Sequence, residues 1–138
     1  MSRAIRCIKN EACMILGIGI DLVEVERLET AIARHGERFL ARVFTAAERA
    51  YCESYARPGE RYAARFAAKE AAMKALGTGW HGVGWREFEV WREASGPPRL
   101  RLHGQAQELA LSQGMASWRL SLTHTHHYAI AQVIAESS

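Results

Sequence analysis

The stretch RYAARFAAKEAAMKAL, residues 61–76, constrains the fold of this chain more than any other segment. Ala, Arg, Lys, Glu, Met and Leu make up most of it, and all are strong helix formers. Gly77 follows directly, and glycine is a common residue at the C-terminal stop of a helix. The segment therefore predicts a long helix, whose small alanine side chains leave room for a bulky group to approach.

The residues before this helix predict a strand followed by another helix. Residues 14–20, MILGIGI, are a short apolar run broken by two glycines, which is typical of a buried strand with close backbone approaches. Asp21 ends the run. Apolar residues then recur at helical spacings of three and four as far as Gly36, a natural stop. The members of this stripe are Leu22, Val25, Leu28 and Ile32.

A capping box predicts a further helix between these two. Thr45 and Glu48 have the spacing at which each side chain bonds the backbone N–H of the other residue. That helix should run to about Tyr55, and Pro58-Gly59 should break it.

The C-terminal half consists mainly of predicted strands. Residues 87–93 alternate like a strand, and residues 99–102 form its hairpin partner across a Gly-Pro turn. Residues 105–114 indicate a short helix, and residues 117–125 and 128–136 indicate two final strands. The order is a strand, then helices, then strands with one helix inserted, which predicts an α+β fold rather than a βαβ repeat.

Length and composition fit one globular domain. The chain has 138 residues, of which 49% are hydrophobic and 24% are charged, enough to bury a core. We expect residues 1–13 to be a loose extension and residues 14–138 to be the domain, with Met14 as the true start of the protein.

The charge of the chain bears on its class of partner, and its cysteines bear on its cellular compartment. The formal net charge is +3, which favours acidic partners, but the basic residues do not cluster as in a nucleic-acid-binding tail. The three cysteines form no CxxC, which favours reduced thiols in a cytosol. No apolar run approaches the roughly 18 residues of a membrane helix. We therefore expect a cytoplasmic protein that binds neither nucleic acid nor membrane.

Two acidic residues are candidate metal ligands. Asp21 is either a helix N-cap or a ligand of a hard metal, and its two oxygens allow both. Glu70 either lies on a solvated face beside Lys74 or joins Asp21 as a ligand. Two oxygen ligands from distant segments, completed by waters and substrate phosphates, are what Mg²⁺ usually takes. Arg65 and Lys69 would then flank the metal and hold phosphate oxygens.

Two further segments have both a functional and a structural interpretation. The loop that starts with Gly77-Thr78-Gly79 either cradles a phosphate through its backbone N–H groups or simply stops the helix, and it is neither a Walker A loop nor a dinucleotide fingerprint. His124 and His126 would share one face of a strand. No cysteine or HExxH partner supports zinc, so a structural role is the simpler interpretation.

Four segments, taken together, resemble one family. They are GIGIDLVEVERLE at 17–29, ARHGERFLARVFTAAE at 33–48, RFAAKEAAMKALGTG at 65–79 and SLTHTHHYAIA at 121–131. The family is that of the holo-acyl-carrier-protein synthases, and the third segment is highly specific for it. The resemblance implies a single compact α+β domain of the 4′-phosphopantetheinyl transferase type, with an antiparallel sheet packed on helices.

The resemblance also implies an activity. Family members transfer 4′-phosphopantetheine from coenzyme A to a serine of apo-acyl carrier protein, leave adenosine 3′,5′-bisphosphate and support fatty acid biosynthesis. They need Mg²⁺, form homotrimers and bind coenzyme A between subunits. The serine proton would go to a metal-bound water, to Glu70 or to His124.

Family positions carry over to this chain residue by residue. Asp21 and Glu70 match the Mg²⁺ ligands, and Arg27 matches the helix that faces the acidic carrier protein. The implied catalytic residues are Glu70, Lys74 and His124. The implied coenzyme A contacts are Arg65, Lys69, Lys74, Gly77, Thr78 and Gly79.

The chain departs from the family pattern in two places, and two other functions fit the same residues. Ile20 stands where a polar Thr is frequent, and Trp80 and His81 make the glycine loop bulky. A nonenzymatic module that binds nucleotide or acidic protein would not need both acids. A metal-dependent phosphohydrolase would use water in place of the serine.

Overall fold

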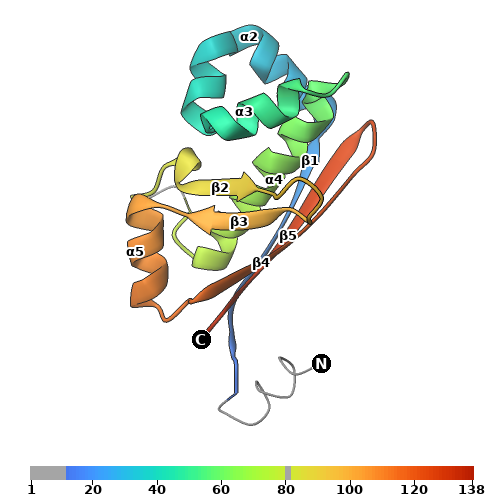
Figure 1. Ribbon diagram of the computed structural model, residues 1–138. Helices are drawn as coiled ribbons and strands as arrows, with labels where there is room; N and C mark the ends of the chain where they lie inside the picture. Colours follow the sequence, from blue (N-terminus) through green and yellow to red (C-terminus); the bar gives the residue numbers. More distant parts are fainter. Residues whose placement is uncertain (1–11, 80–81) are drawn as a thin grey trace.

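Helix α4 (Pro58–Leu76) lies at the centre of the computed structural model, which describes residues 12–79 and 82–138 (Figure 1). All seven of its alanines are buried. Because these side chains are small, neighbouring backbones come close to the helix on several sides. The long helix predicted from the sequence is confirmed, and it begins at Pro58, a favoured first residue of a helix.

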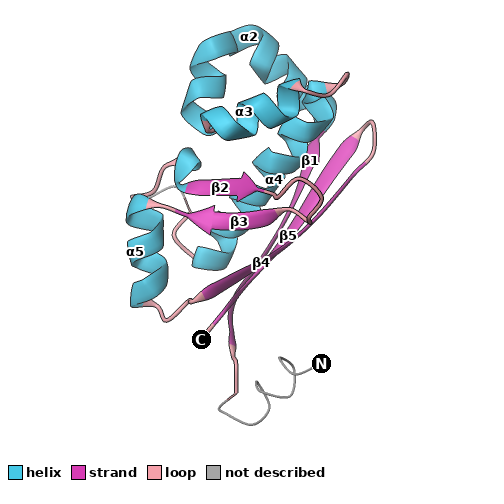
Figure 2. Ribbon diagram, viewed as in Figure 1, coloured by secondary structure: helices cyan, strands magenta, loops and turns pink. Residues whose placement is uncertain are grey.

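A three-stranded antiparallel sheet packs against α4. Its strand order is β1 (Ile15–Glu24), β5 (Tyr128–Glu136) and β4 (Ser117–His124), so the first and last strands of the chain lie side by side (Figure 2). Alternate residues of β5 face the helix and are fully buried. These residues are Ala129, Ala131, Val133 and Ala135.

Two glycines let β1 lie directly on α4. A Cβ atom at Gly17 would overlap the carbonyl oxygen of Ala75, and one at Gly19 would overlap that of Ala71. The predicted close backbone approach is therefore confirmed. The predicted burial of this strand is wrong, because side chains alternate across a strand and the large ones point away from α4. The exposed side chains are Ile15, Ile18, Ile20 and Leu22, at 59–63% exposure.

Helix α2 (Val25–Val43) begins later than its apolar stripe predicted. Strand β1 continues through Asp21 as far as Glu24, so the N-cap interpretation of Asp21 is wrong. The N-cap residue is Glu24, which makes no side-chain cap bond, and Leu22 belongs to the strand. Gly36 is not helical, at φ 53° and ψ −131°, so the predicted stop there is confirmed, and a second helical segment continues α2 beyond the kink.

Helix α3 (Ala46–Glu53) opens with the predicted capping box. The Thr45 hydroxyl accepts a hydrogen bond from the Glu48 N–H at 3.1 Å, and the Thr45 N–H donates to Glu48 Oε1 at 2.8 Å. The helix ends two residues before the predicted Tyr55. Both α2 and α3 contact α4, which fixes them over its first half (Figure 1).

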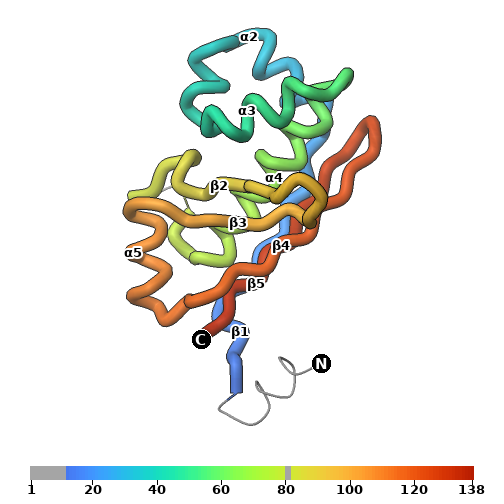
Figure 3. Tube along the Cα trace, in the orientation of Figure 1, coloured from blue at the N-terminus to red at the C-terminus, as the bar shows by residue number. Residues whose placement is uncertain are grey.

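A hairpin and a last helix complete the domain. A 3₁₀ turn (Trp85–Glu87) leads into β2 (Phe88–Trp91), which pairs with β3 (Arg99–Leu102), and α5 (Gly104–Ser112) follows. The hairpin is confirmed, although it forms a second sheet of its own. It contacts α3, α4 and β4 and so joins the helices to the larger sheet (Figure 3).

The result is a single compact α+β domain with antiparallel sheets packed on helices, as the sequence predicted. Of the predicted extension 1–13, only Ala12 and Cys13 are described, and neither has regular structure. In the ranges 12–79 and 82–138, no helix is both long and apolar enough to cross a membrane.

Candidate active site

The carboxyl groups of Asp21 and Glu70 meet where β1 crosses α4. Asp21 lies on the same face of β1 as Gly17 and Gly19, so its side chain points toward the helix, and only 10% of it is exposed. Its Oδ2 atom is buried and has no hydrogen-bond partner among the described residues while both groups are ionised. Glu70 is close enough to donate a hydrogen bond to Asp21 when it is protonated.

This carboxylate pair, Asp21 and Glu70, places two acidic groups close enough to repel each other. Burial, then the charge of Asp21, then the hydrogen bond to Asp21 raise the pKa of Glu70 to about 7, and the Lys74 ammonium opposes the rise. Two carboxylates this close repel each other, and either a shared proton or a bound cation relieves the repulsion.

Lys74 is the cation that faces the pair. Its Nζ atom lies 3.1 Å from Asp21 Oδ1 and donates to the carbonyl oxygen of Ile20 at 2.9 Å. The side chain of Lys74 is 56% exposed, so it is free to turn toward a ligand. Ile20, which stands where the family frequently has Thr, points to the other face of the sheet. This difference from the family pattern therefore does not alter the contacts of Asp21 and Glu70.

A cavity of about 360 Å³ opens beside the carboxylate pair. Arg27, in the first turn of α2, lines it together with Asp21 and Glu70. The structure therefore brings Arg27, predicted to face the carrier protein, to the same site as the metal candidates. The rest of the wall is largely apolar, and two of its members, Leu22 and Leu28, belong to the apolar stripe noted in the sequence. The apolar members are Leu22, Val23, Leu28, Ala31, Phe39 and Phe66.

The glycine loop reaches the carboxylate pair from the end of α4. Gly77 ends the helix in the left-handed conformation at φ 82°, and Gly79 lines a hollow of about 70 Å³ beside Glu70 and Lys74. The Thr78 hydroxyl is buried and has no hydrogen-bond partner within the described part of the chain. The loop thus lies where a phosphate cradle would be needed.

The two bulky residues of this loop that depart from the family pattern, Trp80 and His81, lie outside the described residues.

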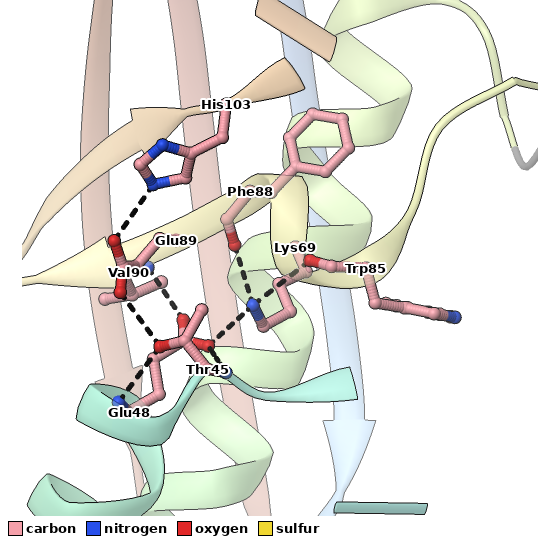
Figure 4. A network of polar contacts seen from close by, with 8 residues as sticks. All are labelled: Thr45, Glu48, Lys69, Trp85, Phe88, Glu89, Val90 and His103. Carbon is pink, nitrogen blue, oxygen red and sulfur yellow. Dashed lines mark hydrogen bonds and ion pairs between the residues drawn. The ribbon is translucent and has the colours of Figure 1, made fainter. Parts of the chain in front are cut away.

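The structure does not bring Lys69, a predicted coenzyme A contact, together with the carboxylate pair. Five residues of helix separate it from Lys74, which turns the two side chains about 140° apart. The Lys69 ammonium is fully buried, 2.8 Å from Glu48 Oε1 (Figure 4). It also donates to the carbonyl oxygens of Phe88 at 2.7 Å and Trp85 at 3.2 Å. An ammonium held in this way is unavailable to a phosphate.

Arg65 points to the same side of α4 as Lys69. It is 5% exposed, and its guanidinium carbon lies 4.0 Å from the ring centre of Tyr51. Its Nε atom is buried and makes no hydrogen bond to the described residues. The structure therefore does not bring Arg65 together with the carboxylate pair of the same chain.

His124 also lies apart from the pair within one chain. Its Nδ1 atom is 3.4 Å from Glu60 Oε1, and the Nδ1 atom of His126 is 3.2 Å from Glu60 Oε2. Glu60 precedes Glu70 by ten helical residues, or about 15 Å along the helix axis. Nothing in the sequence marked Glu60, because both histidines lie more than sixty residues away from it.

The residues of the site fit a hard divalent cation. In the part of the chain that the structure describes, no group of three or more His, Cys, Asp or Glu side chains is arranged to hold a metal, so nothing there supports a zinc site. Asp21 and Glu70 offer carboxylate oxygens beside an open cavity. Such a set suits an ion that takes its remaining ligands from water and phosphate.

Comparison with known proteins gives the fold and the site their context. The profile of the 4′-phosphopantetheinyl transferase superfamily matches residues 17–133. The chain is 55% identical over 124 residues to a holo-[acyl-carrier-protein] synthase of Koribacter versatilis. The aligned region covers 89% of this chain and 99% of that protein. This chain therefore belongs to the 4′-phosphopantetheinyl transferase superfamily.

Solved structures narrow the type of enzyme. The holo-[acyl-carrier-protein] synthase of Neisseria meningitidis matches with a TM-score of 0.81 and 34% identity, over 90% of this chain and 100% of that one. The synthase of Bacillus anthracis was solved in complex with CoA (3′,5′-ADP). It matches with a TM-score of 0.74 and 36% identity, over 91% of this chain and 99% of that one. The enzyme is of the holo-[acyl-carrier-protein] synthase type, which confirms the resemblance seen in the sequence.

Proposed function

We propose that this enzyme transfers 4′-phosphopantetheine from coenzyme A to a serine of apo-acyl carrier protein, releases adenosine 3′,5′-bisphosphate and requires Mg²⁺. The observation that carries the proposal is the carboxylate pair, which shares a cavity with Arg27 and faces Lys74. The names of the relatives and the CoA complex of the Bacillus anthracis enzyme support the two substrates.

In this proposal Asp21 and Glu70 would hold the metal through their carboxylate oxygens, a donor set that suits a hard divalent cation. Bound Mg²⁺ supplies neutralisation of the charge on phosphate oxygens of coenzyme A. The Oδ2 atom of Asp21, which has no partner among the described residues while both groups are ionised, and the raised pKa of Glu70 support a cation here.

The chain's own donors bind the remaining phosphate charge. Lys74 is more than half exposed, so its ammonium can turn from Asp21 to a phosphate oxygen. A preorganised donor of this kind contributes about 3 kcal/mol to a transition state that develops negative charge. The backbone at Gly79, beside Glu70, offers N–H groups to the same phosphates. Lys69 takes no part.

The transfer is a displacement at phosphorus. The serine oxygen forms a bond to the phosphorus that carries pantetheine, and the bond from that phosphorus to the bridging pyrophosphate oxygen breaks. The bridging oxygen leaves with the electron pair on adenosine 3′,5′-bisphosphate. The serine proton passes to Glu70 or His124. A carboxylate that would hold a cation is a poor proton acceptor, which favours His124.

A homotrimer makes His124 available to the carboxylate pair of a neighbouring subunit. Within one chain the two are too far apart, as the ten helical residues between Glu60 and Glu70 require. The uncovered face of the three-stranded sheet supports an interface, because a contiguous apolar face on a protein surface marks an interaction site. Its large side chains include Ile18, Ile20, Leu22, Tyr128 and Ile130, all at least 36% exposed.

Arg27 receives the carrier protein in this proposal. It lies in the first turn of α2 and lines the same cavity as the carboxylate pair. An acidic carrier protein bound to Arg27 would therefore place its serine next to the proposed metal ligands. Fatty acid biosynthesis in the cytoplasm is the setting that the resemblance implies for this reaction.

The test is the intact mass of an apo-acyl carrier protein incubated with the enzyme, coenzyme A and Mg²⁺, with a parallel sample in EDTA. We expect the carrier to gain the mass of one phosphopantetheine, and only without EDTA. Cleavage of coenzyme A without modification of the carrier would indicate a phosphohydrolase instead. No change in either substrate, from folded enzyme and several carriers, would favour a binding module.

A further inference from the structure

The turn between β4 and β5 and the first turn of α4 form a charged cluster that the transfer mechanism leaves unexplained. The Glu60 residue is 7% exposed, and its carboxylate lies between two imidazole rings. The Oε1 atom is 3.4 Å from Nδ1 of His124, and the Oε2 atom is 3.2 Å from Nδ1 of His126. Arg57 Nη1 lies 3.2 Å from the same Nδ1 atom of His126.

The carboxylate of Glu60 acts as an acceptor only. Burial raises the pKa of Glu60, but the hydrogen bond and charge of His126, together with those of His124, lower it to below its ordinary value. The group is therefore ionised at neutral pH, and it has no hydrogen of its own to donate. Any ring nitrogen that bonds to it must carry the hydrogen.

The two histidines differ in what else they face. Nδ1 of His126 lies between Glu60 and Arg57, so it either donates to the carboxylate or accepts from the guanidinium. Nδ1 of His124 faces Glu60 alone among the described residues. A neutral imidazole carries one hydrogen, so a hydrogen on Nδ1 leaves Nε2 with a free lone pair on the far side of the ring. The His124 side chain is 30% exposed, so part of the ring is accessible to a substrate.

We propose that Glu60 is a positioning residue that holds His124 as the Nδ1–H tautomer, so that Nε2 accepts the proton of the carrier serine. The part of this inference that concerns the transfer rests on the proposed function. In the step, the serine hydroxyl hydrogen moves to Nε2 as the oxygen bonds to phosphorus. The imidazolium formed keeps its Nδ1–H bond to the carboxylate, which stabilises the new positive charge.

The tautomer can be measured without any activity. We would record the ¹⁵N chemical shifts of the imidazole rings in the ¹⁵N-histidine-labelled protein above neutral pH, and assign them with His124→Gln and His126→Gln. We expect His124 to carry its hydrogen on Nδ1 in the wild type. In Glu60→Gln, which keeps the shape of the side chain and removes its charge, we expect the population to shift toward Nε2–H.

Kinetics separate positioning from a purely structural role. We expect Glu60→Gln to lower kcat about 10–100-fold, as is usual for a partner that orients a reacting imidazole. KM for coenzyme A should stay within about 2-fold. His126→Gln is the matched control and should retain most of kcat. The double variant Glu60→Gln/His124→Gln should be no slower than His124→Gln alone, because both changes remove one function.

The outcomes distinguish this inference from the proposed function. A wild-type His124 with its hydrogen on Nε2 would overturn the inference, even if Glu60→Gln fails to fold. So would wild-type kcat in Glu60→Gln or in His124→Gln. A wild-type enzyme that modifies no carrier but shows Nδ1–H at His124 would refute the proposed transfer and leave the positioning of the ring by Glu60 standing.

Discussion

Helix α4 carries two clusters of lysine and carboxylate that have similar composition and opposite character. On one side, Lys69 and Glu48 form an ion pair of 2.8 Å in which both side chains are fully buried. On the other side, Lys74 and Asp21 form a pair of 3.1 Å, in which Lys74 is 56% exposed and Glu70 adds a second carboxylate.

The difference lies in how completely each cluster is satisfied. Glu48 accepts hydrogen bonds from the N–H groups of Thr45 and Val90 in addition to Lys69, and so ties α3, α4 and β2 together (Figure 4). In a buried pair the loss of hydration offsets much of the attraction, so this cluster fixes an arrangement rather than adding much stability. In the open cluster, Oδ2 of Asp21 has no partner among the described residues while both carboxylates are ionised, and the two carboxylates together can bind a cation.

The largest effect is expected at the open cluster. Glu70→Gln and Asp21→Asn should each lower the rate of carrier modification by about 10³-fold or more, because each removes the charge of a proposed metal ligand. Both variants should fold, since neither carboxylate supports packing. Steady-state turnover and circular dichroism check this, with Glu26→Gln, an exposed acid of the first turn of α2, as the control. Full turnover in Glu70→Gln would contradict the ligand assignment.

The buried cluster should show the reverse pattern. Lys69→Met leaves the buried carboxylate of Glu48 without its cation, and we expect the free energy of unfolding to fall by about 3–5 kcal/mol. Urea denaturation measures it, and Lys69→Met/Glu48→Gln should recover part of the loss. Turnover per folded molecule, measured at low temperature, should remain within about 3-fold of wild type. Loss of turnover without loss of stability would indicate that Lys69 contacts coenzyme A after all.

The pH dependence of stability should distinguish the two clusters further. The pKa of Glu70 is raised from its ordinary value of 4.5 to about 7, so between these values the folded protein binds more protons than the unfolded chain. Stability of the metal-free protein should therefore fall as pH rises from about 4.5 to about 7, by about 1–2 kcal/mol after solvent screening. Glu70→Gln should remove this slope, and Mg²⁺ should oppose it. A free energy of unfolding that rises from pH 4.5 to pH 7 in the wild type but not in Glu70→Gln would contradict the repulsion between the two carboxylates.

The smallest effect is expected at the edge of the buried cluster. Thr45→Ala removes the cap of α3 and the hydrogen bond of 2.9 Å from the Thr45 hydroxyl to Glu89. We expect a loss of about 1–2 kcal/mol in stability and no change in turnover per folded molecule. Thermal unfolding measures the loss, and Thr45→Ser, which keeps the hydroxyl, should restore most of it. A turnover defect in folded Thr45→Ala would show that the two clusters are coupled.

Local sequence patterns predicted the parts of this molecule that depend on neighbouring residues. The capping box of Thr45 and Glu48, the long alanine-rich helix and the hairpin all follow from spacings of a few residues, and all are present. The close approach of β1 at Gly17 and Gly19 was also foreseeable, because glycines in an apolar strand leave little else to explain them.

Long-range partners could not be predicted in the same way. Lys69 and Lys74 are both basic and both near Glu70 in the sequence, but the direction of each side chain depends on its place around the helix. The partner of buried Lys69 is Glu48, for which the sequence pattern indicates only a capping role. The link between Glu60 and the histidines likewise depends on how the β4–β5 turn meets α4.

The most direct test of the central claim is a Mg²⁺ titration of carrier modification, run in parallel on wild type, Glu70→Gln and folded Lys69→Met. We expect wild type and Lys69→Met to saturate at the same Mg²⁺ concentration, and Glu70→Gln to stay inactive throughout. Activity of Glu70→Gln that matches wild type, or a Mg²⁺ requirement altered by Lys69→Met, would contradict the division of α4 into one cluster that binds the metal and one that holds the fold.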